Sequence, residues 1–314
     1  MSTSLVNDAL DRAEQRLFAQ PVLESFVARR EAGLTDDGDA EIAAALAGEL
    51  IAHASPNGSW GDSLALTAEA VLTLAQLRPF DDTVVDAIER ALSWLRTRQR
   101  APGSFVDVCT AERHALSLCH HFAGGFFSPG PATVSLAGAT LSTGALLPTD
   151  EDARLALSAL ALRAVLEFEP PTLDDRLQFD SLRRIAEMLF TEQSRVSMPA
   201  AVAVLVALTR APRTASHTAI LHGALSRLAG LQRADGSWPG AEGFHVADAF
   251  MIAEKAGYSS PLFDSAIVRT AELLSHSQQP DGSWSSDAGP QRLLIGWRTL
   301  RYAANLRSAR NRKS

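Results

Sequence analysis

The sequence predicts an all-α protein, an α/α toroid (α6/α6 barrel) built from six helical hairpins. Three observations predict this class. A short glycine motif ends several helical segments at a regular spacing, a less polar helical segment follows each motif, and no stretch has the alternation and β-branched content of a strand. The chain has 314 residues, of which 46% are hydrophobic and 21% charged, so it can bury one large core and is typical of a globular protein.

The repeated motif is a glycine followed by serine and an aromatic residue. Its four copies lie at 56–60, 102–105, 235–238 and 281–284. Three copies have a glutamine four residues before the glycine, at Gln99, Gln232 and Gln278. Asp-Gly or Asn-Gly supplies the positive-φ turn that ends a helix, the tryptophan fills an apolar space, and the glutamine amide can bond to backbone groups at a neighbouring helix end. We therefore expect these residues to be structural and not catalytic.

The spacing of the motif places the helical hairpins in order along the chain. Each begins with an amphipathic helix, as in 85–95, and continues into a more apolar one, as in 64–77. The long interval without the motif holds further apolar segments at 150–168 and 198–208. The expected hairpins are 41–77, 83–122, 133–168, 174–209, 214–256 and 261–306. We expect N-terminal helices in 1–40 that pack on a toroid domain spanning 41–314. A solenoid is the alternative, but six units of this length favour closure.

Two segments depart from this regular pattern. The stretch 133–142 comes closest to a strand, but Gly138 and its alanines argue against one. The glycine- and proline-rich stretch 123–131 predicts a loop, which we expect at one rim of the toroid.

Charge and hydropathy exclude several functions. A net charge of −7 argues against a nucleic-acid partner, which needs a basic face. The longest apolar run, 198–208, is too short to cross a bilayer. Asp8 and Asp11 interrupt the N-terminal region, so it lacks the apolar core of a secretory signal, and we expect a cytoplasmic protein without a transmembrane segment.

The segments 232–238 and 278–284, with glutamine, three residues, glycine, one residue and tryptophan, resemble the QW repeat of squalene-hopene cyclases and related class II terpene cyclases. Protein prenyltransferase β subunits share the toroid. The resemblance covers most of the chain as a fold. It implies a terpene cyclase-like enzyme, an isomerase or lyase of isoprenoid biosynthesis, that cyclises a linear isoprenoid or prenyl diphosphate after protonating it. The implied partners are a hydrophobic isoprenoid and a second protein domain or a homo-oligomer. No cofactor is required, and magnesium would enter only with a diphosphate.

The candidate acids lie where an apolar inner helix begins, since such ends face the centre of a toroid. Class II cyclases share a DxDD motif whose middle aspartate protonates an alkene or epoxide, and this sequence has none. The nearest match holds Asp150, Glu151 and Asp152, the predicted catalytic residues. Three adjacent carboxyl groups can hold one proton near neutrality. The same residues also make a good helix start with Thr149 as N-cap, and the helix dipole would then lower their pKa.

The predicted substrate-binding residues are Asp107, His245, Asp248 and Arg292. The segment 245–249 resembles DxDD with Ala247 in the place of the acid, and Arg292 opens an inner helix where it could bind a diphosphate.

The segment 106–109 resembles the Asp-x-Cys zinc ligands of prenyltransferase β subunits, and Phe244 with His245 resembles their aromatic-His pair. The family places these ligands in neighbouring repeats, whereas here they are about three repeats apart, so we expect no zinc site.

Three functions remain open. The first is a protonation-initiated cyclase. The second is a non-catalytic isoprenoid-binding module or a subunit of a heteromer, and the third is a zinc prenyltransferase β-like subunit. Two features argue against the first: the chain is only 6% aromatic, and it has the length of one domain where class II sites normally lie between two.

Overall fold

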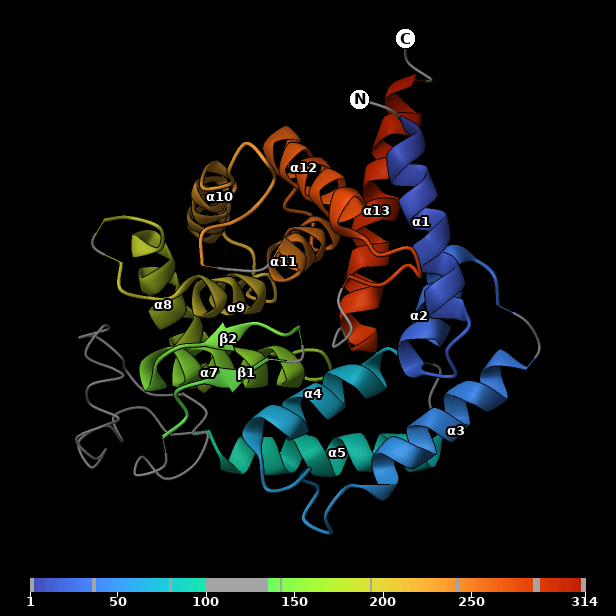
Figure 1. Ribbon diagram of the computed structural model, residues 1–314. Coiled ribbons are helices and arrows are strands. Elements are labelled where there is room, and N and C mark those ends of the chain that lie inside the picture. The colour runs from blue at the N-terminus through green and yellow to red at the C-terminus, as the bar shows by residue number, and fades with distance from the viewer. Residues whose placement is uncertain are drawn as a thin grey trace. The chain divides into compact units, whose positions relative to one another are not determined.

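The computed structural model describes residues 3–35, 38–78, 81–99, 135–141, 143–192, 194–240, 243–284 and 289–311. Within these residues the chain forms helices and one two-stranded sheet (Figure 1). The elements are α1 (Thr3–Phe18), α2 (Leu23–Ala32), α3 (Asp39–Ala52), α4 (Leu64–Ala75), α5 (Asp82–Thr97), β1 (Ala139–Thr140), β2 (Leu146–Leu147), α7 (Asp150–Val165), α8 (Leu173–Met188), α9 (Met198–Leu208), α10 (Ala215–Gly230), α11 (Gly243–Lys255), α12 (Pro261–Ser277) and α13 (Pro290–Asn311). The all-α class predicted from the sequence is confirmed.

The chain divides into two compact units. The first unit contains Met1–Leu46, Ser142–Ala145 and Leu225–Ser314, and the second unit contains Ala47–Leu141 and Leu146–Ala224. The division into 1–40 and 41–314 stays a prediction.

In the first unit, α13 is a central helix that contacts most of the other helices. It packs against α1, α2, α11 and α12, and it runs beside α1 in Figure 1. Its Trp297 is fully buried, and the indole N–H donates to Glu14 of α1 over 3.0 Å. Arg298 makes two hydrogen bonds, of 2.9 and 2.7 Å, to Glu31 at the end of α2. These contacts fix the N-terminal helices to α13.

In the second unit, the apolar α9 lies against α7 and α8, and α7 also contacts α4 and α5. Buried alanines allow these helices to approach closely: Ala153 and Ala156 of α7 pack with Ala200 of α9, and Leu147 of β2 completes the cluster. The helices predicted at 150–168 and 198–208 are confirmed; α7 ends three residues before the predicted position and α9 ends at it.

The expectation that no strand occurs in 133–142 is wrong. Ala139 pairs with Leu147 in an antiparallel hairpin, and the N–H of Gly138 donates to the Leu147 carbonyl over 2.8 Å. Gly138 has φ of +85°, a conformation that glycine adopts at little cost. Each strand is two residues long, so burial of Leu147 and not an alternating pattern supports the hairpin.

The glycine of the motif lies against the backbone of another helix in all three copies that the structure describes. Gly236 and Gly282 have φ of +87° and +85°, and a Cβ at either position would overlap a backbone carbonyl, that of Arg269 in α12 or of Arg12 in α1. Gly58 approaches Arg90 of α5 in the same way: a Cβ at residue 58 would lie 2.5 Å from the carbonyl oxygen of Arg90. Helix α1 therefore lies against the motif that follows α12, as α12 lies against the motif that follows α10.

The glutamine and tryptophan of the motif satisfy backbone groups at helix ends. The Gln278 amide donates to the carbonyls of Ala9 and Gly282, over 3.0 and 3.1 Å. The indole N–H of Trp284 donates to the Leu274 carbonyl over 2.8 Å, and Trp60 makes the equivalent bond. The structural role predicted for these residues is confirmed.

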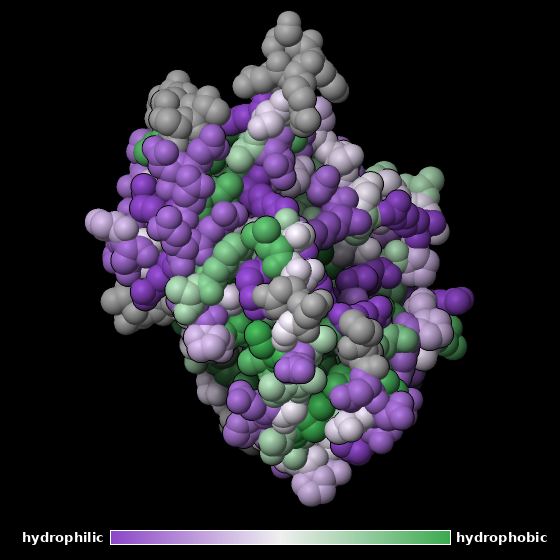
Figure 2. Space-filling view, turned by 90° about the vertical axis from the view of Figure 1, so that its right-hand side faces the viewer, coloured by the Kyte–Doolittle hydropathy of each residue, from purple (hydrophilic) through white to green (hydrophobic). Residues whose placement is uncertain are grey.

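No helix among the described residues is long and apolar enough to cross a membrane. The face shown in Figure 2 is largely hydrophilic, with hydrophobic residues gathered below its centre. Exposed apolar side chains such as Leu173 and Leu34 are ordinary on protein surfaces and identify no site by themselves.

Candidate functional site

Asp152, one of the three predicted acids, connects the starts of α7 and α9. Its carboxylate accepts a hydrogen bond from the Thr149 hydroxyl over 2.8 Å and one from the Ser197 backbone N–H over 2.8 Å. The Thr149 side chain in turn accepts from the Asp152 N–H over 3.1 Å, which makes Thr149 the predicted N-cap. Since Asp152 is only 4% exposed and both its oxygens accept hydrogen bonds, it has a clear structural role.

Asp150 holds the segment that precedes the β hairpin. Its carboxylate accepts hydrogen bonds from the backbone N–H groups of Leu136 and Ala137 and from the Ser135 hydroxyl. The hydrogen bond from Leu136 is the main cause that lowers the pKa of Asp150 below its ordinary value. A carboxylate stabilised in its ionised form is a poor proton donor, so this geometry argues against Asp150 as the acid. Glu151 is half-buried beside it.

A second group of predicted residues meets in the first unit. His245 lies in the first turn of α11, is 6% exposed, and its Nδ1 is hydrogen-bonded to the Thr143 hydroxyl over 3.0 Å. Arg292 lies in the first turn of α13, and its guanidinium is 3.4 Å from the Thr143 carbonyl oxygen and 3.5 Å from that of Gly144. The segment 143–145 thus brings an imidazole and a guanidinium together. The sequence singled out both residues but did not predict that they share a partner.

Asp248 follows His245 by one helical turn on α11 and is half-buried. Asp107 and Cys109 lie outside the described residues. In the part of the chain that the structure describes, no group of three His, Cys, Asp or Glu side chains could hold a metal ion.

Two aromatic side chains pack beside the start of α11. Phe244 and Trp284 meet edge to face with ring centroids 5.4 Å apart. Gly296 of α13 lies under them, since a Cβ there would be 2.5 Å from two ring atoms of Trp284 and 3.0 Å from Phe244. Phe244 directly precedes His245 in α11, so the aromatic pair lies at the same helix start as His245. Thr143, Gly144 and Gly296 were not predicted from the sequence, where the only local signal was a glycine in a segment expected to be helical.

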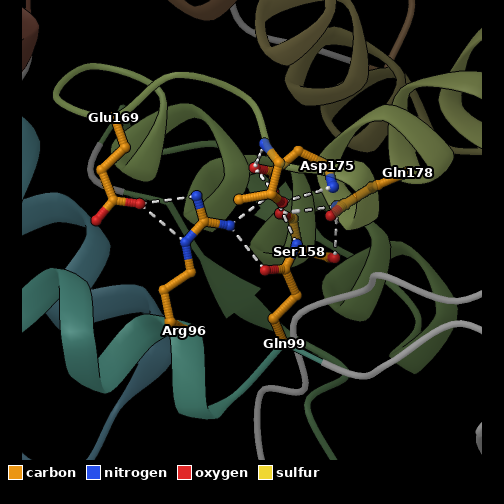
Figure 3. Close-up of polar contacts among 7 residues, drawn as sticks. Arg96, Gln99, Ser158, Glu169, Asp175 and Gln178 are labelled. Carbon is orange, nitrogen blue, oxygen red and sulfur yellow. Dashed lines mark hydrogen bonds and ion pairs between the residues drawn. The ribbon is translucent and has the colours of Figure 1, made fainter.

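The second unit contains a partly buried ionic cluster around the fully buried Asp175, shown in Figure 3. Arg96 of α5 makes two hydrogen bonds to Glu169, of 2.9 and 2.8 Å, and a 2.8 Å bond to Asp175 of α8. Gln99 also donates to Asp175, over 2.7 Å, and the other Asp175 oxygen caps α8 by accepting from Thr172. Burial acts to raise the pKa of Asp175, but these hydrogen bonds and the Arg96 charge outweigh it and lower the pKa. The cluster therefore joins α5 to α8 in the folded structure.

The fold defines the class to which this chain is similar, the type II terpene cyclases. The matching solved structures include variants of MstE from Scytonema. One is in complex with merosterolic acid A (product), at 15% identity, a TM-score of 0.59 and coverage of 97% of this chain and 98% of that chain. Another is in complex with geranylgeranyl dihydroxybenzoate (substrate), at 13% identity, a TM-score of 0.58 and coverage of 97% and 99%. At this identity the likeness shows the fold, and it confirms the predicted α/α toroid class.

No protein-family model matches the chain. No curated protein matches it either.

Proposed function

We propose that this protein is a terpene cyclase-like enzyme that binds a linear isoprenoid or prenyl diphosphate and starts its cyclisation by protonation. The observation that carries the proposal is the match, over almost all of both chains, to cyclase structures that hold a prenylated substrate or product. That match covers 98–99% of chains described as cyclases, so this fold accommodates cyclisation within a chain of similar length. The objection from the length of one domain is thereby weakened.

The polar groups at the starts of α11 and α13 are the proposed contacts for the polar end of the substrate. Arg292 supplies a fixed positive charge, and His245 and Asp248 lie on successive turns of one helix. Asp107 stays a proposed substrate-binding residue. The Phe244 and Trp284 rings beside them would favour a prenyl chain and a developing cation.

The proposed proton donor is one of Asp150, Glu151 and Asp152. The hydrogen bonds described above make Asp150 the weakest candidate, and Asp152 would have to give up one of its two bonds to carry a proton. All three residues are therefore tested. The proposed reaction requires no cofactor, and magnesium would enter only with a diphosphate substrate.

A second candidate is a non-catalytic isoprenoid-binding protein or subunit. The use of the Asp150 and Asp152 carboxylates to hold backbone N–H groups favours it, because neither then serves as an acid.

The test is incubation of the purified chain with geranyl, farnesyl and geranylgeranyl diphosphates, geranylgeranyl dihydroxybenzoate and squalene. Products are separated by gas chromatography with mass detection, with and without phosphatase. The cyclase would be supported by cyclic alcohols that appear from the diphosphates only after phosphatase, or by cyclic products of the other two substrates without it. At least one of Asp150→Asn, Glu151→Gln and Asp152→Asn should abolish these products. Binding without any cyclic product would favour the second candidate, and absence of both binding and product would refute the proposal.

A further inference from the structure

The turn of the β hairpin belongs to one compact unit, and the two strands of the hairpin belong to the other. Ser142–Ala145 belongs to the first unit, whereas β1 and β2 belong to the second. Within the first unit, Thr143 and Gly144 contact the two residues with the strongest claim to bind a polar ligand, His245 and Arg292. This segment is therefore placed to control the geometry of both.

Thr143 determines how the His245 ring is held. Its hydroxyl can donate to an unprotonated Nδ1 or accept from a protonated one, and the 3.0 Å bond fixes the ring plane in either case. In the neutral ring the direction of this bond goes with the tautomer: Nε2 is a donor when the hydroxyl donates to Nδ1, and an acceptor when Nδ1 donates to the hydroxyl. Because His245 is buried in the first turn of α11, few other orientations are open to it.

Gly144 determines where the Arg292 side chain lies. Its φ is +82°, and a Cβ at this position would overlap the guanidinium. The guanidinium can lie against the turn only because residue 144 has no side chain. The two backbone carbonyls it faces, at 3.4 and 3.5 Å, present a pair of oxygen acceptors to its planar fork. Phosphate and carboxylate groups also offer oxygen acceptors to a guanidinium, with a negative charge that strengthens the bonds.

We propose that segment 143–145 is the positioning element of an oxyanion site, in which Arg292 and His245 bind the negatively charged end of an isoprenoid. The inference rests on the proposed function and extends it to a substrate class, isoprenoids that end in a diphosphate or a carboxylate. Thr143 and Gly144 are positioning residues: Thr143 orients the His245 imidazole, and Gly144 gives the Arg292 guanidinium its place. The guanidinium has five N–H donors, so an anion can be bound while Nε and Nη2 face the two carbonyls.

The first experiment reads His245 directly. Protein labelled with 15N in histidine is compared as wild type, Thr143→Ser and Thr143→Val, with His245→Gln used to assign the signals. The Ser variant keeps the hydroxyl and should retain the wild-type ring 15N shifts, whereas the Val variant should change the tautomer balance. A Val variant that is folded and shows unchanged His245 shifts would overturn the role of Thr143.

The second experiment measures the affinity of the full chain for geranylgeranyl diphosphate, geranylgeranoic acid and geranylgeraniol by calorimetry. Arg292→Lys keeps the charge but loses the planar fork, and Gly144→Ala displaces it. Each should weaken binding of at least one of the two anions about tenfold or more, the loss of one charge-assisted hydrogen bond, and leave the alcohol within about twofold. The anion affected shows whether the site takes diphosphate or carboxylate. Equal losses for anions and alcohol would overturn the proposal.

Gly138→Ala is the matched control for Gly144→Ala. Gly138 lies in the same hairpin with φ of +85°, but nothing lies within 4 Å of its would-be Cβ. The two variants therefore share backbone strain and differ in the clash with Arg292, so only Gly144→Ala should discriminate against the anions.

Inorganic pyrophosphate separates failure of this inference from failure of the proposed function. If the wild type binds none of the three isoprenoids but millimolar pyrophosphate shifts the His245 signals, the oxyanion site stands and the isoprenoid function fails. If isoprenoids bind and the variants treat anion and alcohol alike, the proposed function stands and the site fails. If neither isoprenoid nor pyrophosphate has an effect, both fail.

Discussion

Replacing Gly296 with alanine tests whether the start of α11 and the middle of α13 are packed as described. In an exposed helix the change would stabilise the protein by up to about 1 kcal/mol, because glycine costs more backbone entropy. Here the new Cβ would lie 2.5 Å from two atoms of the Trp284 ring and 3.0 Å from Phe244. The Trp284 ring cannot retreat freely, since its N–H is bonded to the Leu274 carbonyl at 2.8 Å.

Overpacking of this kind costs about 1–3 kcal/mol, and loss of the indole hydrogen bond about 1 kcal/mol more. Against the propensity gain, we expect Gly296→Ala to lower the free energy of unfolding by about 1–3 kcal/mol, measured by urea denaturation followed by circular dichroism. Gly48→Ala in α3 is the control, because nothing lies within 4 Å of its would-be Cβ, and it should be neutral or stabilising. A Gly296→Ala protein as stable as Gly48→Ala would refute the packing described here.

Three further predictions concern the second unit. Asp175→Asn should lower the free energy of unfolding by about 3 kcal/mol, because it removes a buried partner of Arg96. The control Asp180→Asn, on the exposed side of the same helix, should lower it by less than about 1 kcal/mol. Equal losses would contradict the role given to Asp175. Burial lowers the pKa of His217 below 6.5, so the contribution of the neutral imidazole to stability is complete above that pH and is lost as the pH falls through the lower folded pKa. Between pH 8 and pH 5 the melting temperature should therefore fall less steeply for His217→Gln than for the wild type. Identical slopes would count against this. The pKa of Asp150 is lowered from 3.8, so the contribution of its carboxylate to stability is present above that pH and is lost as the pH falls through the folded-state pKa. In denaturant titrations, Asp150→Asn should be less stable than the wild type at pH 7 but closer to it in stability below pH 3.

The fold was predictable because the motif has a local physical cause. A glycine at positive φ, a glutamine that reaches a neighbouring helix end and an indole that caps a carbonyl are each encoded within seven residues. The start of α7 was equally local, with Thr149 as its N-cap. The β hairpin was not predictable in this way, because each strand has two residues and depends on burial of Leu147 against helices.

The candidate site was predictable only residue by residue. His245 and Arg292 stand out as polar residues at the starts of apolar helices, but their shared partner Thr143 is 102 residues from one and 149 from the other. No local pattern encodes such a contact. The acids were ambiguous for another reason, because acidic residues at a helix start suit both a structural role and a proton donor. The sequence does not show that backbone N–H groups of 135–137 and Ser197 donate to Asp150 and Asp152, and these hydrogen bonds favour the structural role.

The amides of Gln232 and Gln278 and the indoles of Trp60 and Trp284 are already bonded to the scaffold, and this separates what the fold likeness implies from what it leaves open. In both Gln232 and Gln278 the amide nitrogen donates to backbone carbonyls, and the amide oxygen accepts from an arginine, Arg269 of α12 or Arg12 of α1. Any substrate chemistry must therefore come from side chains outside the motif, where a chain with the same scaffold is free to differ. The choice between cyclase and binding protein depends on the few polar groups at the starts of α7, α11 and α13, and of these the acids of α7 decide whether a proton is delivered.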